Sequence, residues 1–227
     1  MKCLCPCARF LWAIVVCTAV PVSAFGITPS QIDTFQDGAV GNWSGGGSGS
    51  PVNVATGGPT GAGDRFLQIA SGATPLPPRL LMFNQSQWTG DFVAAGVTRV
   101  AMDLFNTGAS TLPIRITIRE GTGGSTTPGY SSTTPFNLPG DGTWHHAVFL
   151  LDAANLTGVN TPQPLATDLA NVKEFRILAS TTPSTVGDLL TAQLGVDNIA
   201  AVPEPQSLLL AIAAGGALWI ARRQQHE

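Results

Sequence analysis

The sequence lacks cysteine beyond its first segment. All four cysteines, Cys3, Cys5, Cys7 and Cys17, fall within the first 24 of its 227 residues. The Cys-x-Cys-x-Cys spacing is compatible with metal binding, but a segment that is removed during export ligates nothing in the mature protein. We therefore predict a mature domain without a disulfide, a thiol nucleophile or a cysteine-ligated metal.

Charged residues are also scarce, at 11% of the chain. Between Phe25 and Val202 there are seven basic and twelve acidic residues. Proteins that bind nucleic acid present a basic stripe to the phosphates. The acidic balance therefore argues against a nucleic-acid partner.

The N-terminal segment has the pattern of a cleavable signal peptide. Lys2 and Arg9 precede an apolar run over residues 10–20, and Val22-Ser23-Ala24 supplies the small residues that signal peptidase requires. The apolar run has about half the length needed to span a bilayer, which argues against a permanent membrane helix. We predict cleavage after Ala24, so that residues 1–24 are the signal peptide.

The C-terminal segment has the pattern of a single membrane-spanning helix. Residues 205–221 are 17 consecutive residues without a charge, and Arg222-Arg223 follow at once, which places that end in the cytoplasm. Before them, the two prolines of Val202-Pro203-Glu204-Pro205 keep the backbone extended around one carboxylate. An extended peptide just outside a membrane is accessible to a processing enzyme.

Residues 202–227 resemble a PEP-CTERM sorting signal. The resemblance is carried by Val202-Pro203-Glu204-Pro205, Leu208-Leu209-Leu210, Trp219 and Arg222-Arg223. It implies a protein of a Gram-negative bacterium that crosses the inner membrane, is held there briefly by its tail, and is cut near Pro-Glu-Pro by an exosortase. The cargo would then reach the outer surface or the extracellular matrix.

The middle of the chain, residues 25–201, is predicted to be one all-β domain. Residues 114–119 alternate apolar and polar without a break, which predicts a strand with isoleucines on one face and water on the other. Segments rich in glycine, serine and threonine separate the strands, and two of them, residues 44–50 and 121–129, are candidate mobile loops at one end. We expect an antiparallel two-sheet β-sandwich, a jelly roll, joined to the tail by a linker over residues 200–205. The other expected strands are Ile32–Phe35, Phe66–Ala70, Arg79–Phe83, Arg99–Phe105, Trp144–Leu151, Phe175–Leu178 and Leu194–Ile199.

Two segments resemble the jelly-roll, galactose-binding-like modules of carbohydrate-binding proteins. These are Asp33-Thr34-Phe35-Gln36-Asp37-Gly38, with Trp43 following, and Val196-Asp197-Asn198-Ile199. The resemblance implies that the first and last strands lie side by side and hold a structural calcium through Asp33 and Asp197, with Asp37 as a weaker ligand. The alternative is that these aspartates only end strands and form Asx turns. A second stretch, residues 141–146, resembles the Trp-His-His strand of laminin-G-like sandwiches, so the choice of family stays open.

Aromatic residues in polar surroundings are the candidates for sugar binding, because a ring can stack on the apolar face of a pyranose. Trp43 and Trp144 are expected in the core. Trp88, within Asn84-Gln85-Ser86-Gln87-Trp88-Thr89, and Tyr130, in a loop rich in glycine, proline and serine, are the candidate carbohydrate-binding residues. The alternative for both is an ordinary loop aromatic.

No catalytic constellation is recognisable. Glu120 and Glu174 are the only glutamates of the predicted domain, and both are expected at solvated surface positions. His145 and His146 are neighbours in a predicted strand and point to opposite faces, so they do not chelate one metal; one is expected to be buried and the other exposed. We therefore name no catalytic residue.

The sequence as a whole predicts a non-enzymatic, exosortase-processed surface or biofilm-matrix protein that associates with extracellular polysaccharide. Two alternatives remain. One is a structural or adhesive matrix protein that binds other proteins or itself, and the other is a polysaccharide-cleaving enzyme with an unusual pair of aspartates.

Overall fold

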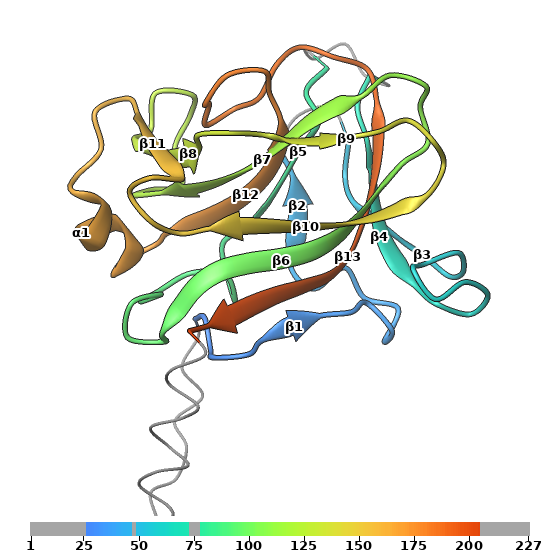
Figure 1. Ribbon diagram of the computed structural model, residues 1–227, viewed down its shortest axis with the longest axis horizontal. Coiled ribbons are helices and arrows are strands. Elements are labelled where there is room, and N and C mark those ends of the chain that lie inside the picture. Colours follow the sequence, from blue (N-terminus) through green and yellow to red (C-terminus); the bar gives the residue numbers. More distant parts are fainter. Residues whose placement is uncertain (1–25, 47–48, 73–77, 205–227) are drawn as a thin grey trace, which may run out of the picture.

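Alternating side chains along short strands build two antiparallel sheets that face each other across an apolar core (Figure 1). The computed structural model describes residues 26–46, 49–72 and 78–204. The expectation of an all-β, two-sheet sandwich is confirmed. The predicted signal peptide lies outside the described residues, as do Pro205, Arg222 and Arg223 of the predicted sorting tail.

The first sheet has six strands, in the order β10-β6-β13-β4-β3 with β1 paired to β13. Its last strand in the sequence, β13, therefore lies in the middle of the sheet. The strands are β1 (Ile32–Asp33), β3 (Val52–Val54), β4 (Phe66–Ala70), β6 (Val97–Asn106), β10 (Trp144–Leu150) and β13 (Gln193–Pro203).

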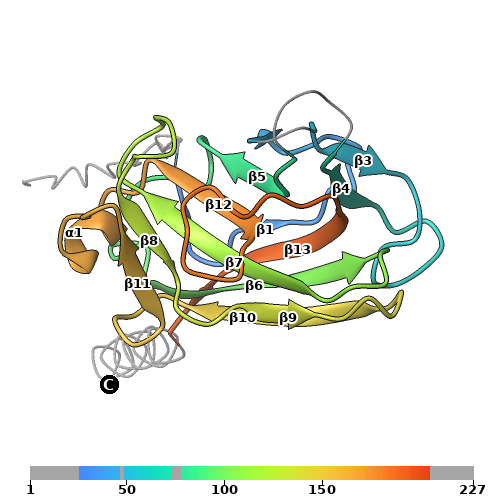
Figure 2. The same ribbon diagram turned by 90° about the horizontal axis from the view of Figure 1, so that it is seen from above.

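The second sheet has seven strands, in the order β11-β8-β7-β12-β5-β2 with β9 paired to β7. The short helix α1 (Leu165–Leu169) lies beside β11 and β8 at one end of the described part of the chain, while β3 and β4 lie at the other (Figure 2). The strands are β2 (Trp43–Gly45), β5 (Leu81–Asn84), β7 (Leu112–Arg119), β8 (Gly129–Ser132), β9 (Phe136–Leu138), β11 (Leu156–Val159) and β12 (Glu174–Ala179).

The core lies between the sheets and is filled from both by every second residue. Strand β7 contributes Ile114, Ile116 and Ile118, all buried, which confirms the predicted apolar face of residues 114–119. Strands β12, β6 and β13 add further apolar side chains from the facing positions. Burial of this continuous apolar surface is the main force that holds the two layers together.

The first and last strands lie side by side, as expected. Ile32 pairs with Ala200 and Asp33 with Ile199, and a bulge interrupts β13 between Asp197 and Ala200. The expected linker over residues 200–205 is wrong, because β13 continues to Pro203, which pairs with Val97. Proline is tolerated there because it is the last residue of the strand.

Candidate functional site

The outer face of the seven-stranded sheet carries an unusual set of polar side chains. Strand pairing aligns one row across six strands, from β2 to β11. A second row places Glu174 opposite Arg119 on β7. The members of the first row are Ser44, Phe83, Arg176, Thr117, Ser131 and Thr157.

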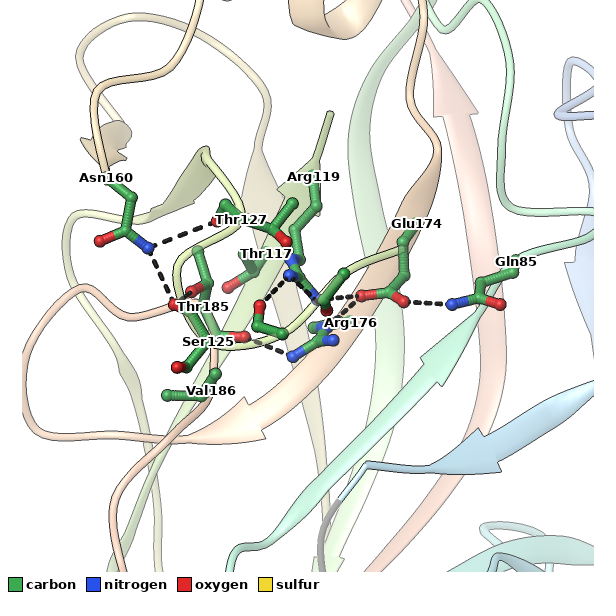
Figure 3. Close-up of polar contacts among 12 residues, drawn as sticks. Gln85, Thr117, Arg119, Ser125, Thr127, Asn160, Glu174, Arg176, Thr185 and Val186 are labelled. Carbon is green, nitrogen blue, oxygen red and sulfur yellow. Dashed lines mark hydrogen bonds and ion pairs between the residues drawn. The ribbon is translucent and has the colours of Figure 1, made fainter. Parts of the chain in front are cut away.

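Three charged residues of this face form a buried ion cluster (Figure 3). Glu174 Oε1 accepts from Arg119 Nη1 at 2.7 Å and also from Arg176 Nε. Its second oxygen, Oε2, accepts from the Gln85 side chain. Burial lowers the pKa of Arg176, and the contact with Glu174 opposes that shift.

The buried position of Glu174 corrects the expectation of a solvated surface glutamate. Its side chain is 1% exposed, and that of Arg119 is 0% exposed. Charges are removed from water at a high cost unless they are paired and hydrogen-bonded. Glu174 meets that condition by forming ion pairs with Arg119 and Arg176 through the same oxygen, which makes it a structural residue of this face.

Two loops, residues 121–128 and 181–187, cover the part of the face over β7 and β12. Arg119 Nη2 donates to Gly123 O at 2.9 Å, and Arg176 Nη1 donates to Thr185 O at 2.6 Å. Thr117 Oγ1 donates to Ser184 O at 2.9 Å. The prediction that this face of residues 114–119 meets water is therefore wrong, because loop carbonyls replace the solvent. The glycine-rich loop joins the end of β7 to the start of β8 and folds back over this face, where Arg119 donates to Gly123 O and Thr185 donates to Ser125 O.

The part of the face over β5 is different, because it keeps a half-buried aromatic ring. Phe83 lies in the first row, between Ser44 of β2 and Arg176 of β12. The Arg176 guanidinium carbon lies 5.8 Å from the centroid of the Phe83 ring, a cation–π arrangement. Gln85 is exposed to solvent, and its side-chain amide is held beside the cluster because it donates a hydrogen bond to Glu174. A ring held by a guanidinium beside a polar amide can stack on a sugar and hydrogen-bond its hydroxyls.

Trp88, a predicted sugar-binding residue, lies in the core, and its assignment to a binding surface is corrected. Its side chain is 0% exposed, and its indole N–H donates to Asp33 Oδ2 at 2.8 Å. The indole packs against Phe175 with ring centroids 5.2 Å apart and against Trp43 at 6.2 Å. The polar residues around Trp88 in the sequence did not indicate exposure, because they turn the chain while the ring points inward.

Tyr130 is half-buried on the inner side of β8, opposite Ile118. Its hydroxyl donates to Gln163 O at 2.9 Å, close to the start of α1. It therefore does not share a surface with Phe83. The structure brings neither of the two predicted aromatic residues to the open part of the outer face.

The three predicted calcium ligands have separate hydrogen-bond partners. Asp33 Oδ2 accepts from both Trp43 and Trp88 indole N–H groups at 2.8 Å, and burial raises its pKa. Asp37 Oδ1 accepts from the Ala39 amide, as in an Asx turn. Together with Phe35 they line an open hollow of about 250 Å³. Within residues 26–46, 49–72 and 78–204, no three acidic, histidine or cysteine side chains gather as a metal site.

Asp197 differs from these two aspartates. It is fully buried at the bulge of β13; Oδ1 accepts from the Asn198 amide, while Oδ2 has no hydrogen-bond partner. Burial raises its pKa to about 7, and the nearby charges of Asp64 and Asp103 add to the shift. A buried, unsatisfied carboxylate oxygen is the kind of group that a cation would satisfy.

The two histidines take opposite sides of β10, as predicted. His146 Nδ1 lies 2.8 Å from Asp103 Oδ1, and its side chain is 63% exposed. His145 Nε2 lies 3.0 Å from Asp141 Oδ2 with a side chain that is 28% exposed. One histidine is therefore exposed, and the other is only partly buried. They have separate carboxylate partners and share no common ligand position.

The buried carboxyl group of Asp168, in α1, makes stability depend on pH. Burial, together with the neighbouring Glu120, raises the pKa of Asp168 to about 7. The folded state therefore keeps a proton that the unfolded state loses near pH 4, so stability should fall as the pH rises from about 4 to about 7. We expect the melting temperature to be lower by a few degrees at pH 8 than at pH 5, and Asp168→Asn to weaken this dependence. Identical pH profiles for the wild type and the variant would contradict the assignment.

Comparison with known proteins identifies the type of fold but does not assign the chain to a family. No protein-family model and no curated protein sequence matches this chain. Among solved structures, the family 11 carbohydrate-binding module from Clostridium thermocellum in complex with a β-1,3-1,4-mixed-linked tetrasaccharide is similar, with a TM-score of 0.50 and 16% identity. It covers 78% of this chain and 96% of the module. An exo-β-agarase is similar over 78% of this chain but only 25% of its own length, at a TM-score of 0.50 and 11% identity.

A further module of the same family, from the cellulosomal cellulase Lic26A-Cel5E, has a TM-score of 0.50 at 14% identity, over 78% of this chain and 96% of the module. The described domain thus has the β-sandwich fold of carbohydrate-binding modules. At this level of identity the likeness concerns the fold alone.

Proposed function

We propose that this chain is an exported, non-enzymatic protein of the bacterial surface or biofilm matrix whose sandwich binds extracellular polysaccharide. The observation that carries the proposal is the half-buried Phe83 ring, held against Arg176 on the outer face of the seven-stranded sheet. Phe83 would stack on a sugar ring, and Gln85 would hydrogen-bond its hydroxyls. The similarity of the fold to a carbohydrate-binding module in complex with a β-1,3-1,4-mixed-linked tetrasaccharide supports this choice.

Binding to a mixed-linkage β-1,3-1,4-glucan and to the exopolysaccharide of the source organism tests this role. We expect Phe83→Ala to weaken glycan binding roughly tenfold, since a stacked ring contributes on the order of 1 kcal/mol or more. Affinity electrophoresis of the full chain gives the measurement.

Phe105→Ala is the matched control, because Phe105 is a half-buried phenylalanine on the opposite sheet, stacked on Trp144. Equal losses in the two variants, or an unchanged affinity in a folded Phe83→Ala protein, would argue against the site.

We propose calcium as a structural ligand of this domain, centred on Asp197 and not on Asp33. Asp197 supplies the unsatisfied buried oxygen, whereas Asp33 Oδ2 is already occupied by two indole N–H groups. Bound calcium would compensate the negative charge of the Asp197 carboxylate, which the nearby charges of Asp64 and Asp103 disfavour. Calcium should then raise the melting temperature of the wild type relative to chelator and leave that of Asp197→Asn unchanged.

The sorting tail is the second part of the proposal. Its motif begins on the folded domain: Val202 and Pro203 belong to β13, and Glu204 follows directly. Cleavage after Glu204 would leave β13 whole. Among the described residues no helix is long and apolar enough to cross a membrane, and residues 205–221 lie outside them.

Mass spectrometry of the extracellular protein tests the tail. We expect a C-terminus near Pro203 to Pro205, produced by an exosortase at the inner membrane. Recovery of extracellular protein that still carries Arg222 and Arg223 would contradict this processing.

A further inference from the structure

The folded domain ends almost at the first residue of the uncharged tail segment. Pro203 pairs with Val97, and the Glu204 amide donates to Gly96 O at 3.3 Å. The preceding Ala201 amide donates to Gln31 O at 2.8 Å. The uncharged run begins at Pro205. An extended residue advances the chain by about 3.5 Å, so one or two residues keep that run within about 7 Å of the domain.

The surface around this exit point is apolar. An open hollow of about 320 Å³ is lined by Pro29, Ala94, Ala95 and Pro203, and also by the polar residues Ser30 and Glu204. In the same loop, Val93 is 57% exposed. Packing within the domain does not require exposed apolar residues at the point where the chain leaves it, so their presence there indicates an interaction surface.

The outer face of the six-stranded sheet continues this surface. Leu150 pairs with Arg99, which pairs with Val202; in the next row Val148 pairs with Ala101 and Ala200 with Ile32. Ile32, Val148 and Leu150 are 52%, 48% and 42% exposed. Of the six large apolar side chains that are exposed in the described part of the chain, four therefore lie at this end. Figure 1 shows the end of β13 beside the start of β6 and close to β1.

We propose that this exit surface, formed by Ile32, Val93, Ala94, Val148 and Leu150, docks on the lipid bilayer while the tail is inserted. The inference rests on the proposed membrane-spanning tail. A spacer of one or two residues holds this end of the domain against the headgroups, and four large apolar side chains can then enter the interface. Arg99, between Leu150 and Val202, lies where it can meet lipid phosphates.

Docking would also orient the molecule. Phe83 belongs to the outer face of the other sheet, so the proposed glycan site points away from the docked sheet face. The anchored protein could then engage polysaccharide before it is released.

The test uses the full chain in vesicles of neutral and anionic phospholipid at three to one. A fluorescent label is placed at Ala94→Cys on the exit surface or at Ala109→Cys, an exposed alanine in the loop that follows the far end of β6. Both variants are made in a chain whose native cysteines, Cys3, Cys5, Cys7 and Cys17, are changed to serine. We expect a quencher carried on lipid headgroups to reduce the fluorescence at position 94 at least threefold more than at position 109.

Flotation separates the two proposals. If the chain floats with the vesicles but the two labels are quenched equally, the docking surface is refuted and the tail is not. If the chain does not float, the tail does not insert into the bilayer, and the proposed membrane-spanning tail and the docking surface are both refuted. Self-quenching between labels at position 94, without lipid quenching, would show that a second copy covers the surface and would overturn the proposal.

Discussion

Glu174→Ala is expected to destabilise the folded domain by about 3 to 5 kcal/mol. The substitution leaves Arg119 and Arg176 buried side by side with no carboxylate between them. Their side chains are 0% and 9% exposed, so water does not replace the lost partner. Denaturant titration followed by tryptophan fluorescence measures the free energy of unfolding.

Glu174→Gln is the matched control, because it keeps the volume and one acceptor oxygen while removing the charge. We expect a loss that is substantial but smaller than for alanine, since hydrogen bonds to the two guanidinium groups remain possible. A Glu174→Ala protein within about 1 kcal/mol of the wild type would show that solvent reaches the cluster, and the description of a closed face would then be wrong.

Trp88→Ala is expected to cost about 3 to 5 kcal/mol of stability, as is typical for a large buried aromatic residue. It removes ring contacts with Phe175 and Trp43 and one of the two indole donors to the half-buried Asp33 carboxylate. Thermal and denaturant unfolding give the measurement.

Trp88→Phe separates the two contributions, because it keeps a ring and removes only the indole N–H. A loss of about 1 to 3 kcal/mol is expected for the one hydrogen bond that is removed, while Trp43 still donates to the Asp33 carboxylate. A folded Trp88→Ala protein of wild-type stability that no longer binds glycan would instead restore Trp88 as a surface contact.

The strands with a strong apolar periodicity could be predicted from the sequence, and several of the short ones could not. Residues 114–119 alternate strictly, and their isoleucines lie in the core. The three-residue strands β2, β3 and β9 carry too few side chains for a period to show. They are fixed by pairing with longer neighbours, which is a tertiary effect. The extension of β13 to Pro203 was missed because two prolines normally indicate a linker.

The candidate site shows what local sequence does not contain. Residues 80–83 are all apolar, so nothing in the sequence says that Leu80 and Met82 face the core while Phe83 faces outward. Likewise, alternation marks Arg115 to Arg119 as an outer face, but it does not show that the loops of residues 121–128 and 181–187 fold back over that face. Exposure depends on which segments pass over a strand, and the nearest partners of Arg176 come from its own strand and from Thr185.

The central position of β13 has a consequence for the order of folding. This strand joins β6 on one side and β4 on the other, yet it is the last strand to emerge in the sequence. Until residues 193–203 arrive, both neighbours present unpaired edges that can associate with other chains. A chain that ends before residue 193 should therefore aggregate, and the domain completes its first sheet only as the tail itself emerges.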